Sequence, residues 1–239
     1  MFCNIDDNLF ESQFRNLNKI ICTPYRIFKK MRRFIFILFL FLNIPAFSQE
    51  TLETKRYAIE VAGIKVGEMH ATKRTLGKGV VKYHVKSDVK VNLLVYTLKI
   101  KYEISSQFDK YGLVYSEAKV NSNKGDFFTT TALKNGVYEV KSKQEKKEFE
   151  KNISTDVTWS SSRLFFDEPT NNQKFYAEYY ALFNNVKKNK DGTFTCQIEN
   201  NIDKYVYENQ KLVRVIKKNP IKNIELRFIS EKVTTNSGI

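Results

Sequence analysis

Residues 126–143, DFFTTTALKNGVYEVKSK, decide the fold class of this chain. Two runs with a strand-like composition, Asp126–Leu133 and Val137–Lys143, lie on either side of the pair Asn135-Gly136. A two-residue type I′ turn needs positive φ at both central positions, and Asn and Gly adopt this conformation most easily. The stretch therefore predicts an antiparallel β-hairpin.

Similar short runs with alternating apolar and polar residues recur on both sides of this hairpin. They begin at Tyr57, Ile64, Val81, Leu98, Gly112, Thr193, Tyr205, Leu212 and Ile224. Together with the hairpin they predict about ten or eleven short strands, and the connections are too short for helical crossovers between parallel strands. We therefore expect an all-β, mainly antiparallel fold, built as a single sandwich or a curved half-barrel of about ten strands.

The middle and the end of the chain have different patterns. A polar residue at 154–156 is able to cap a short helix that runs near 157–166 and ends before Pro169. Residues 174–185 have both helical and strand spacing, so their structure stays open. We expect residues 49–232 to form a single exported β domain and residues 233–239 to form a loose C-terminal tail.

An apolar run near the beginning of the chain has the features of a secretory signal peptide. A basic pair precedes the run Phe34–Leu42, and Ala46 and Ser48 provide the two small residues of a cleavage site. The run is shorter than the ~20 residues of a membrane-spanning helix. We therefore expect residues 31–48 to be removed and Gln49 to begin a periplasmic or extracellular protein.

The first thirty residues do not fit this interpretation, because a signal peptide normally stands at the start of a protein. Residues 1–30 have no sustained helix or strand period, and we interpret them as a mis-assigned N-terminal extension. Beyond residue 48 there is no second long apolar run, which predicts no membrane span in the mature chain. Cys196 is the only cysteine there, and its apolar neighbours predict a buried thiol.

The chain is basic, with 40 Lys and Arg against 26 Asp and Glu. A positive charge favours anionic partners such as membranes or acidic polysaccharides. The bases are interleaved with acids, as in KSKQEKKEFEK at 141–151, and this pattern is typical of a solvated sheet edge. Because we expect the chain to be exported, nucleic acid is not an expected partner.

Three motifs together give the sequence a resemblance. They are YxIxVxGxxxG at 57–67, LFFDEP at 164–169 and YxYENxxLV at 205–213. Over residues 55–230 the chain resembles a family of exported bacterial envelope proteins that is classed only as a domain of unknown function. The resemblance implies a periplasmic or surface location, an antiparallel β fold and no particular activity. Where the family's final hairpin has a glycine, this chain has Gln210-Lys211, which leaves the type of that turn open.

Few residues in the chain are candidates for chemistry. A two-residue loop at Gly77-Lys78 would place His70 and His84 on opposite faces of a hairpin, whereas a one-residue bulge would bring the two imidazoles together. Ser160–Ser162 lack the glycine elbow of a nucleophile, and we interpret them as a helix start. Asp167-Glu168 precede a proline, which favours a turn over a catalytic acid pair. We therefore assign no catalytic, metal-binding or cofactor-binding residue and expect no cofactor.

The aromatic content is the most suggestive feature for function. Its simplest interpretation is packing in the core of the sheet. The alternative is an apolar pocket inside a curved sheet, closed by the segment 157–185. The residues that we assign to this pocket are Trp159, Phe166, Tyr176, Tyr179, Tyr180 and Phe183.

These observations together predict a non-catalytic exported β-sheet protein whose partner is unknown. The candidate partners are a lipid, a glycan or another envelope protein. The alternative function is that of a cell-envelope hydrolase with a site that has no recognisable motif. A solid core would contradict a carrier of apolar ligands, whereas a polar cleft that gathers Asp167, Glu168 and a histidine would support the hydrolase.

Overall fold

The computed structural model describes residues 50–92, 97–123, 125–145, 147–199, 201–218 and 223–236. The predicted extension 1–30, the signal peptide 31–48 and the cleavage residues Ala46, Ser48 and Gln49 lie outside the described residues. Within the described ranges, every helix is too short or too polar to span a membrane.

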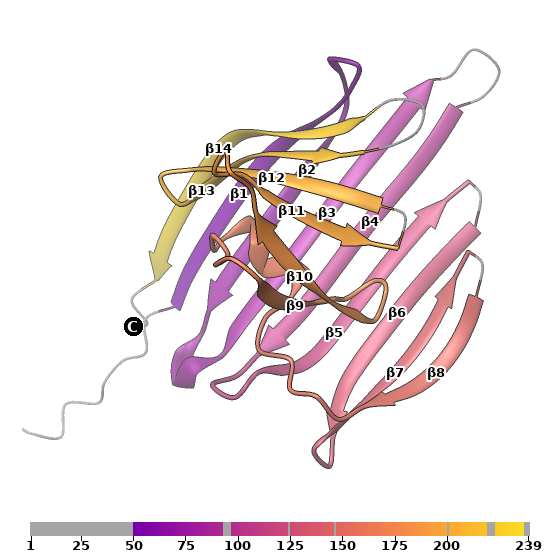
Figure 1. Cartoon of the computed structure of the whole chain (residues 1–239), viewed down its shortest axis with the longest axis vertical. Helices are drawn as coiled ribbons and strands as arrows, with labels where there is room; N and C mark the ends of the chain where they lie inside the picture. Colours follow the sequence, from indigo (N-terminus) through magenta and orange to yellow (C-terminus); the bar gives the residue numbers. More distant parts are fainter. Residues whose placement is uncertain are drawn as a thin grey trace, which may run out of the picture. The chain divides into compact units, whose positions relative to one another are not determined.

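The described chain is almost entirely β-sheet and forms two consecutive meanders (Figure 1). The first contains β1 (Glu50–Val61), β2 (Ile64–Thr75), β3 (Val81–Asn92), β4 (Thr97–Phe108), β5 (Leu113–Ser122), β6 (Gly125–Lys134), β7 (Val137–Gln144) and β8 (Lys147–Ile153). The second contains β9 (Gln173–Ala177), β10 (Leu182–Lys188), β11 (Phe194–Ile198), β12 (Asn201–Glu208), β13 (Lys211–Lys217) and β14 (Ile224–Asn236). In both meanders each strand pairs antiparallel with the next along the chain.

The pairing of β1 with β14 joins the two meanders into one sheet, which has 14 strands in the described residues. Its order is β8-β7-β6-β5-β4-β3-β2-β1-β14-β13-β12-β11-β10-β9, and it does not close into a barrel. The prediction of an all-β, mainly antiparallel fold is therefore confirmed. The predicted number of about ten strands was too low because β8, β9 and β10 have charged or aromatic sequences without a clear period of two.

The sheet curls until the second meander covers the inner face of the first (Figure 1). Strand alternation turns the buried side chains of both meanders toward each other. The hydroxyl of Tyr57 on β1 donates to the carbonyl oxygen of Leu212 on β13 at 3.3 Å. Between β6 and β9, the hydroxyls of Thr131 and Tyr176 form a hydrogen bond at 2.8 Å. The result is a two-layer arrangement made from a single sheet.

The tight turns show how local sequence directs the hairpins. Asn135 and Gly136 have φ values of 50° and 79°, and Lys134 pairs with Val137, so the predicted type I′ turn is confirmed. The final hairpin has the same conformation without glycine, with φ values of 51° at Asn209 and 64° at Gln210. The turn type is therefore unchanged, and Gln210 takes a strained left-handed conformation in place of the glycine.

Residues 154–172 connect the two meanders and contain a short 3-10 helix, η2 (Ser161–Phe165). This agrees with the short helical segment expected near 157–166. The expected cap at 154–156 was wrong, because η2 begins after Ser160, which makes no side-chain cap bond. The open segment 174–185 contains most of the β9–β10 hairpin.

Two other local expectations need correction. The predicted loose tail 233–239 is part of β14 as far as Asn236, because residues 231–236 pair with residues 50–55 of β1. Residues 237–239 lie outside the described residues.

The turn between β2 and β3 is also longer than predicted and contains a second 3-10 helix, η1 (Gly77–Gly79). Because Thr75 pairs with Val81, the register shifts, and His70 pairs with Lys86. His84 pairs with Thr72, so both histidines lie on the outer face of the sheet and not on opposite faces.

Candidate functional site

A cavity of about 390 Å³ lies between the two layers of the curled sheet. This volume falls in the range of about 300–1,000 Å³ that is typical of small-molecule sites. One wall comes mainly from β1–β5 and the other from η2 and β9–β14. Its surface is mostly aliphatic, with side chains such as Val89, Val91, Ile100 and Val120 opposite Val215 and Leu226. The volume and the lining suit an apolar molecule.

Strand alternation explains why these aliphatic residues meet. On β3, residues 87, 89 and 91 point inward, and Lys86, Asp88 and Lys90 are exposed on the other face. Val89 pairs directly with Ile100 on β4, so the inward residues of neighbouring strands form a continuous apolar wall.

Polar side chains from three elements interrupt this wall. Tyr102 comes from β4, Tyr179 and Tyr180 come from the β9–β10 turn, and Asp203 and Tyr205 come from β12. The ring centroids of Tyr102 and Tyr179 lie 6.5 Å apart, and those of Tyr179 and Tyr180 lie 5.1 Å apart. We refer to these five residues as the tyrosine cluster.

Burial keeps the phenols of the tyrosine cluster protonated. It raises the pKa of Tyr102 well above its ordinary value, and the negative charge of Glu178 raises it further. Burial also raises the pKa of Tyr205, and the negative charge of the Asp203 carboxylate raises it further. For Tyr180 the same two causes raise the pKa to about 12. These hydroxyls are therefore neutral hydrogen-bond donors at physiological pH.

Some members of the tyrosine cluster have protein partners. Asn201 donates to the Tyr180 hydroxyl at 3.2 Å, and Lys217 forms an ion pair with Asp203 at 2.5 Å. By contrast, the hydroxyls of Tyr102 and Tyr205 make no hydrogen bond to the described part of the chain. Tyr205 lines the cavity and is only 7% exposed, so its side chain has little access to bulk water.

A smaller cavity of about 170 Å³ adjoins the tyrosine cluster. It shares Tyr180, Ile198, Asp203, Lys217 and Ile224 with the larger cavity. The Asp203–Lys217 ion pair therefore lies between an apolar space and a more polar one.

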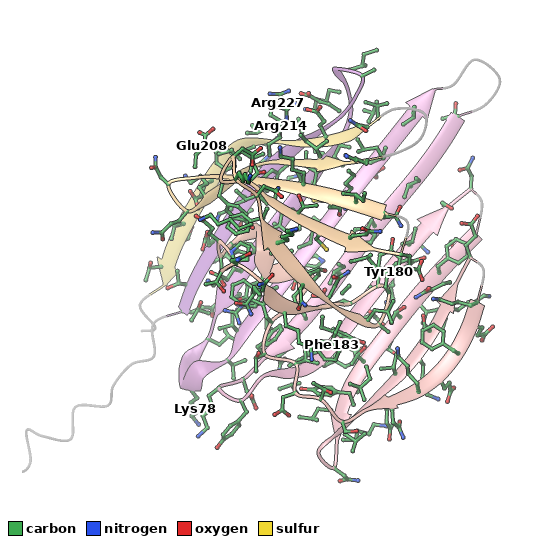
Figure 2. All side chains as sticks on the ribbon, viewed as in Figure 1. Lys78, Tyr180, Phe183, Glu208, Arg214 and Arg227 are labelled. Carbon is green, nitrogen blue, oxygen red and sulfur yellow. The ribbon has the colours of Figure 1, made fainter. Side chains whose placement is uncertain are left out.

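The aromatic residues that we assigned to a pocket do not all lie together. Tyr179 and Tyr180 line the larger cavity. Tyr180 lies in the turn between β9 and β10, whereas Phe183 follows on β10 (Figure 2). The ring of Phe183 packs against buried Tyr176, with 5.4 Å between centroids. Neither Phe183 nor Tyr176 lines the larger cavity.

The remaining two assigned residues belong to the connection between the meanders. Trp159 stacks with Arg163, whose guanidinium carbon lies 4.2 Å from the ring centroid. Phe166 is buried, and its ring lies 5.6 Å from that of Tyr83. Valine and isoleucine residues, which the sequence does not distinguish from ordinary core residues, are instead the largest group in the cavity wall.

The connection is held in place by a buried carboxylate. Glu178, which is 1% exposed, accepts hydrogen bonds from the backbone N–H groups of Ser161 at 3.0 Å and Ser162 at 3.2 Å. It also accepts one from the Ser161 hydroxyl. These are the first residues of η2, so Glu178 satisfies donors that a helix start leaves free. Ser161 also lines the larger cavity.

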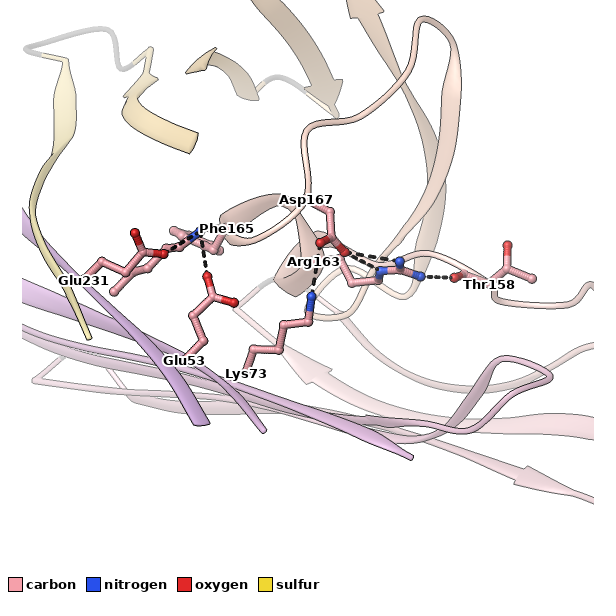
Figure 3. Close-up of polar contacts among 8 residues, drawn as sticks. Glu53, Lys73, Thr158, Arg163, Phe165, Asp167 and Glu231 are labelled. Carbon is pink, nitrogen blue, oxygen red and sulfur yellow. Dashed lines mark hydrogen bonds and ion pairs between the residues drawn. The ribbon is translucent and has the colours of Figure 1, made fainter. Parts of the chain in front are cut away.

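Two groups of charged residues also hold the connection against the first meander (Figure 3). Lys55, which is 3% exposed, donates to the carbonyl oxygen of Phe165 at 3.2 Å. Its ammonium group lies 3.0 Å from the carboxylate of Glu53 and 3.7 Å from that of Glu231. Because Phe165 lines the larger cavity, these contacts position part of the cavity wall.

The second group involves Asp167, one of the acids considered for catalysis. Its carboxylate forms ion pairs of 3.2 Å with both Lys73 and Arg163 (Figure 3). Asp167 and Glu168 line a hollow with Phe166, Pro169 and Gln210, and none of the residues lining this hollow is a histidine.

The other residues considered for chemistry lie apart from the tyrosine cluster. On the outer face, the ring nitrogen Nε2 of His70 lies 3.6 Å from the carboxylate of Glu68, and that of His84 lies 2.6 Å from Glu103. The described residues contain no group of three or more metal-binding side chains. Cys196 is buried as predicted, and burial raises the pKa of its thiol to about 12.

Comparison with known proteins is consistent with this fold. Residues 57–229 match a family model described as a domain of unknown function, DUF6134. No curated protein matches the chain. A solved structure with a similar fold is the crystal structure of a beta-barrel-like protein of domain of unknown function DUF1849 from Brucella abortus.

That similarity has a TM-score of 0.50 at 7% sequence identity and covers 78% of this chain and 98% of the other. At this identity it concerns the fold alone. The match to the family model has almost the same limits as the resemblance seen in the sequence and includes most of the chain. The chain therefore belongs to the DUF6134 family, a domain of unknown function.

Proposed function

We propose that the protein is an exported, non-catalytic carrier that holds a lipid-like molecule between the two layers of its sheet. The observation that carries the proposal is the cavity of about 390 Å³ with its mostly aliphatic walls. Protein interiors are close-packed, so an apolar space of this size suits a guest molecule better than water. A glycan fits less well, because aliphatic walls offer few partners to its hydroxyl groups.

The location rests on the N-terminal sequence. The basic pair, the apolar run Phe34–Leu42 and the small residues Ala46 and Ser48 support export through a cleaved signal peptide. N-terminal sequencing of the protein from the cell envelope should find Gln49 first. Recovery of the protein with residues 1–30 still attached would refute this part of the proposal.

The absence of catalysis is also part of the proposal. The candidate acid Asp167 is neutralised by Lys73 and Arg163, and both histidines project from the other face of the sheet. A general acid or base has to reach the reacting atoms of a bound substrate. None of these residues lines the larger cavity, which supports binding rather than chemistry there.

The carrier proposal is tested by the lipid content of the purified protein. We expect native mass spectrometry and organic extraction to find a lipid bound to wild type. Val89→Phe places a larger side chain in the cavity and should retain less lipid, since the ring occupies part of the space that the guest needs. The matched control is Lys90→Phe on the outer face of the same strand.

Two results would refute the carrier proposal. One is a wild-type protein without lipid, or with a bound polysaccharide or protein in place of lipid. The other is equal lipid retention by Val89→Phe and Lys90→Phe, because the lipid would then lie outside the cavity.

A further inference from the structure

The tyrosine cluster distinguishes between classes of lipid, if the carrier proposal holds. An entirely hydrocarbon ligand in the cavity would exclude water from the hydroxyls of Tyr102 and Tyr205 and leave them without any partner. Both hydroxyls are able to donate to an oxygen atom of a ligand and to accept from a ligand hydroxyl. A ligand with one oxygen-containing end satisfies them, and its chain then extends along Val89, Ile100 and Val120.

The charges around the tyrosine cluster disfavour a ligand with an anionic end group. The negative charge of Asp203 raises the pKa of both Tyr102 and Tyr205, and that of Glu178 raises the pKa of Tyr102. Lys217 is the cation that lines the same cavity, and it is already paired with Asp203 at 2.5 Å. An anionic group would therefore add a negative charge without a partner, which is unfavourable in a low-dielectric site.

A cationic end group is not favoured either. The charge of Asp203 is already balanced by Lys217. Glu178 is occupied by three hydrogen bonds from Ser161 and Ser162, and it is 1% exposed. The lining of the larger cavity therefore offers hydrogen bonds without offering a free charge, and exposed Lys218 belongs to the lining of the smaller cavity alone.

We infer that the ligand is a neutral amphipathic lipid. Its uncharged alcohol or carbonyl oxygen lies at the hydroxyls of Tyr102 and Tyr205, and its hydrocarbon chain lies between the two layers of the sheet. This inference rests on the proposed carrier function and adds the chemical class of the ligand.

The test compares lipids that share one chain and differ in the end group. Diphenylhexatriene, an apolar fluorescent probe without hydrogen-bonding groups, first reports whether the cavity takes up apolar molecules. Tetradecanol, methyl myristate and myristate then compete with it at mildly alkaline pH, where the fatty acid is ionised. We expect the alcohol and the ester to displace the probe at about tenfold lower concentration than myristate, since the cluster has no free cation.

Conservative variants identify the groups involved. Tyr102→Phe and Tyr205→Phe should each weaken tetradecanol binding about fivefold, as expected for one lost hydrogen bond. The same variants should leave the affinity for diphenylhexatriene unchanged, which also shows that they are folded. Tyr111→Phe, at a residue that is 76% exposed, is the matched control and should change neither affinity.

The outcomes separate the two proposals. If diphenylhexatriene does not bind to wild type, the carrier function itself is refuted. If the probe binds but myristate competes as well as tetradecanol, the inference of a neutral ligand is wrong and the carrier proposal stands. The same conclusion follows if both tyrosine variants bind tetradecanol as tightly as wild type.

Discussion

The buried carboxylate of Glu178 gives the most direct test of how the connection between the meanders is held. The residue follows β9, and its three hydrogen bonds go to the start of η2, 16 or 17 residues earlier in the chain. We expect Glu178→Ala to destabilise the domain strongly, because the backbone N–H groups of Ser161 and Ser162 would lose their acceptor.

The magnitude follows from these contacts. A hydrogen bond to a charged group contributes about 1.5–3 kcal/mol, and a buried donor without a partner costs about 1–3 kcal/mol. Ser162 is fully buried and Ser161 is half-buried, so water replaces only part of the loss. We expect Glu178→Ala to lower the free energy of unfolding by about 3–5 kcal/mol and the Tm by about 10 °C. Glu178→Gln retains one acceptor oxygen and should cost about 2 kcal/mol.

The assay is urea unfolding of the purified protein, monitored by circular dichroism and by the fluorescence of Trp159. This is the only tryptophan of the chain, and it lies directly before the η2 region. Glu148→Ala, at an exposed carboxylate on β8, is the control and should unfold like wild type. A free energy of unfolding of Glu178→Ala that differs from wild type by no more than the ~0.5 kcal/mol typical of neutral surface changes would refute the role of this carboxylate.

Three further predictions concern the turn at Gln210, the close contact of Gly67 with β3 and the thiol of Cys196. Gln210→Gly should raise the free energy of unfolding by about 0.5–1 kcal/mol, because glycine tolerates a φ of 64°; an unchanged thermal midpoint would contradict the strain. Gly67→Ala should lower the free energy of unfolding, measured in urea, by about 2 kcal/mol or more, because an added Cβ would lie 2.2 Å from the carbonyl oxygen of Asp88. The Cys196 thiol should react with a thiol reagent only on unfolding, because it is buried. Burial raises its pKa from 9.0 to about 12, so the unfolded state loses this proton first and stability should fall as the pH rises through this interval. Cys196→Ala should make that alkaline decline shallower by up to about 1.4 kcal/mol per pH unit, and identical slopes would contradict it.

Local sequence predicts a strand correctly where the turn residues and the alternation of apolar and polar residues indicate the same hairpin. The hairpin around Asn135-Gly136 needs only two residues to direct it, and the structure has the expected turn. The charged strand β8 and the aromatic β9–β10 hairpin have no such agreement. Their conformation depends on partners that are distant in sequence, such as Thr131 for Tyr176.

The cavity was less accessible to sequence reasoning than the sheet. A valine such as Val89 has the same pattern whether it packs against a neighbour or faces a cavity. Only the curl of the sheet, which brings β12 and β13 opposite β3 and β4, decides between the two. Tyr179 and Tyr180 belong to the pocket that we assigned from the sequence, whereas Tyr102 and Tyr205 join them through tertiary structure.

The place of β14 beside β1 has a consequence for the order in which the molecule can be assembled. A chain is synthesised from its N-terminus, so β1 is made well before β14, the partner with which it pairs. Until then, the inner surface of β1–β5 is uncovered, and closing so distant a contact is slow. A nascent molecule of this kind therefore passes through a stage in which it is vulnerable to aggregation, and a chaperone that shields the first meander would act at that stage.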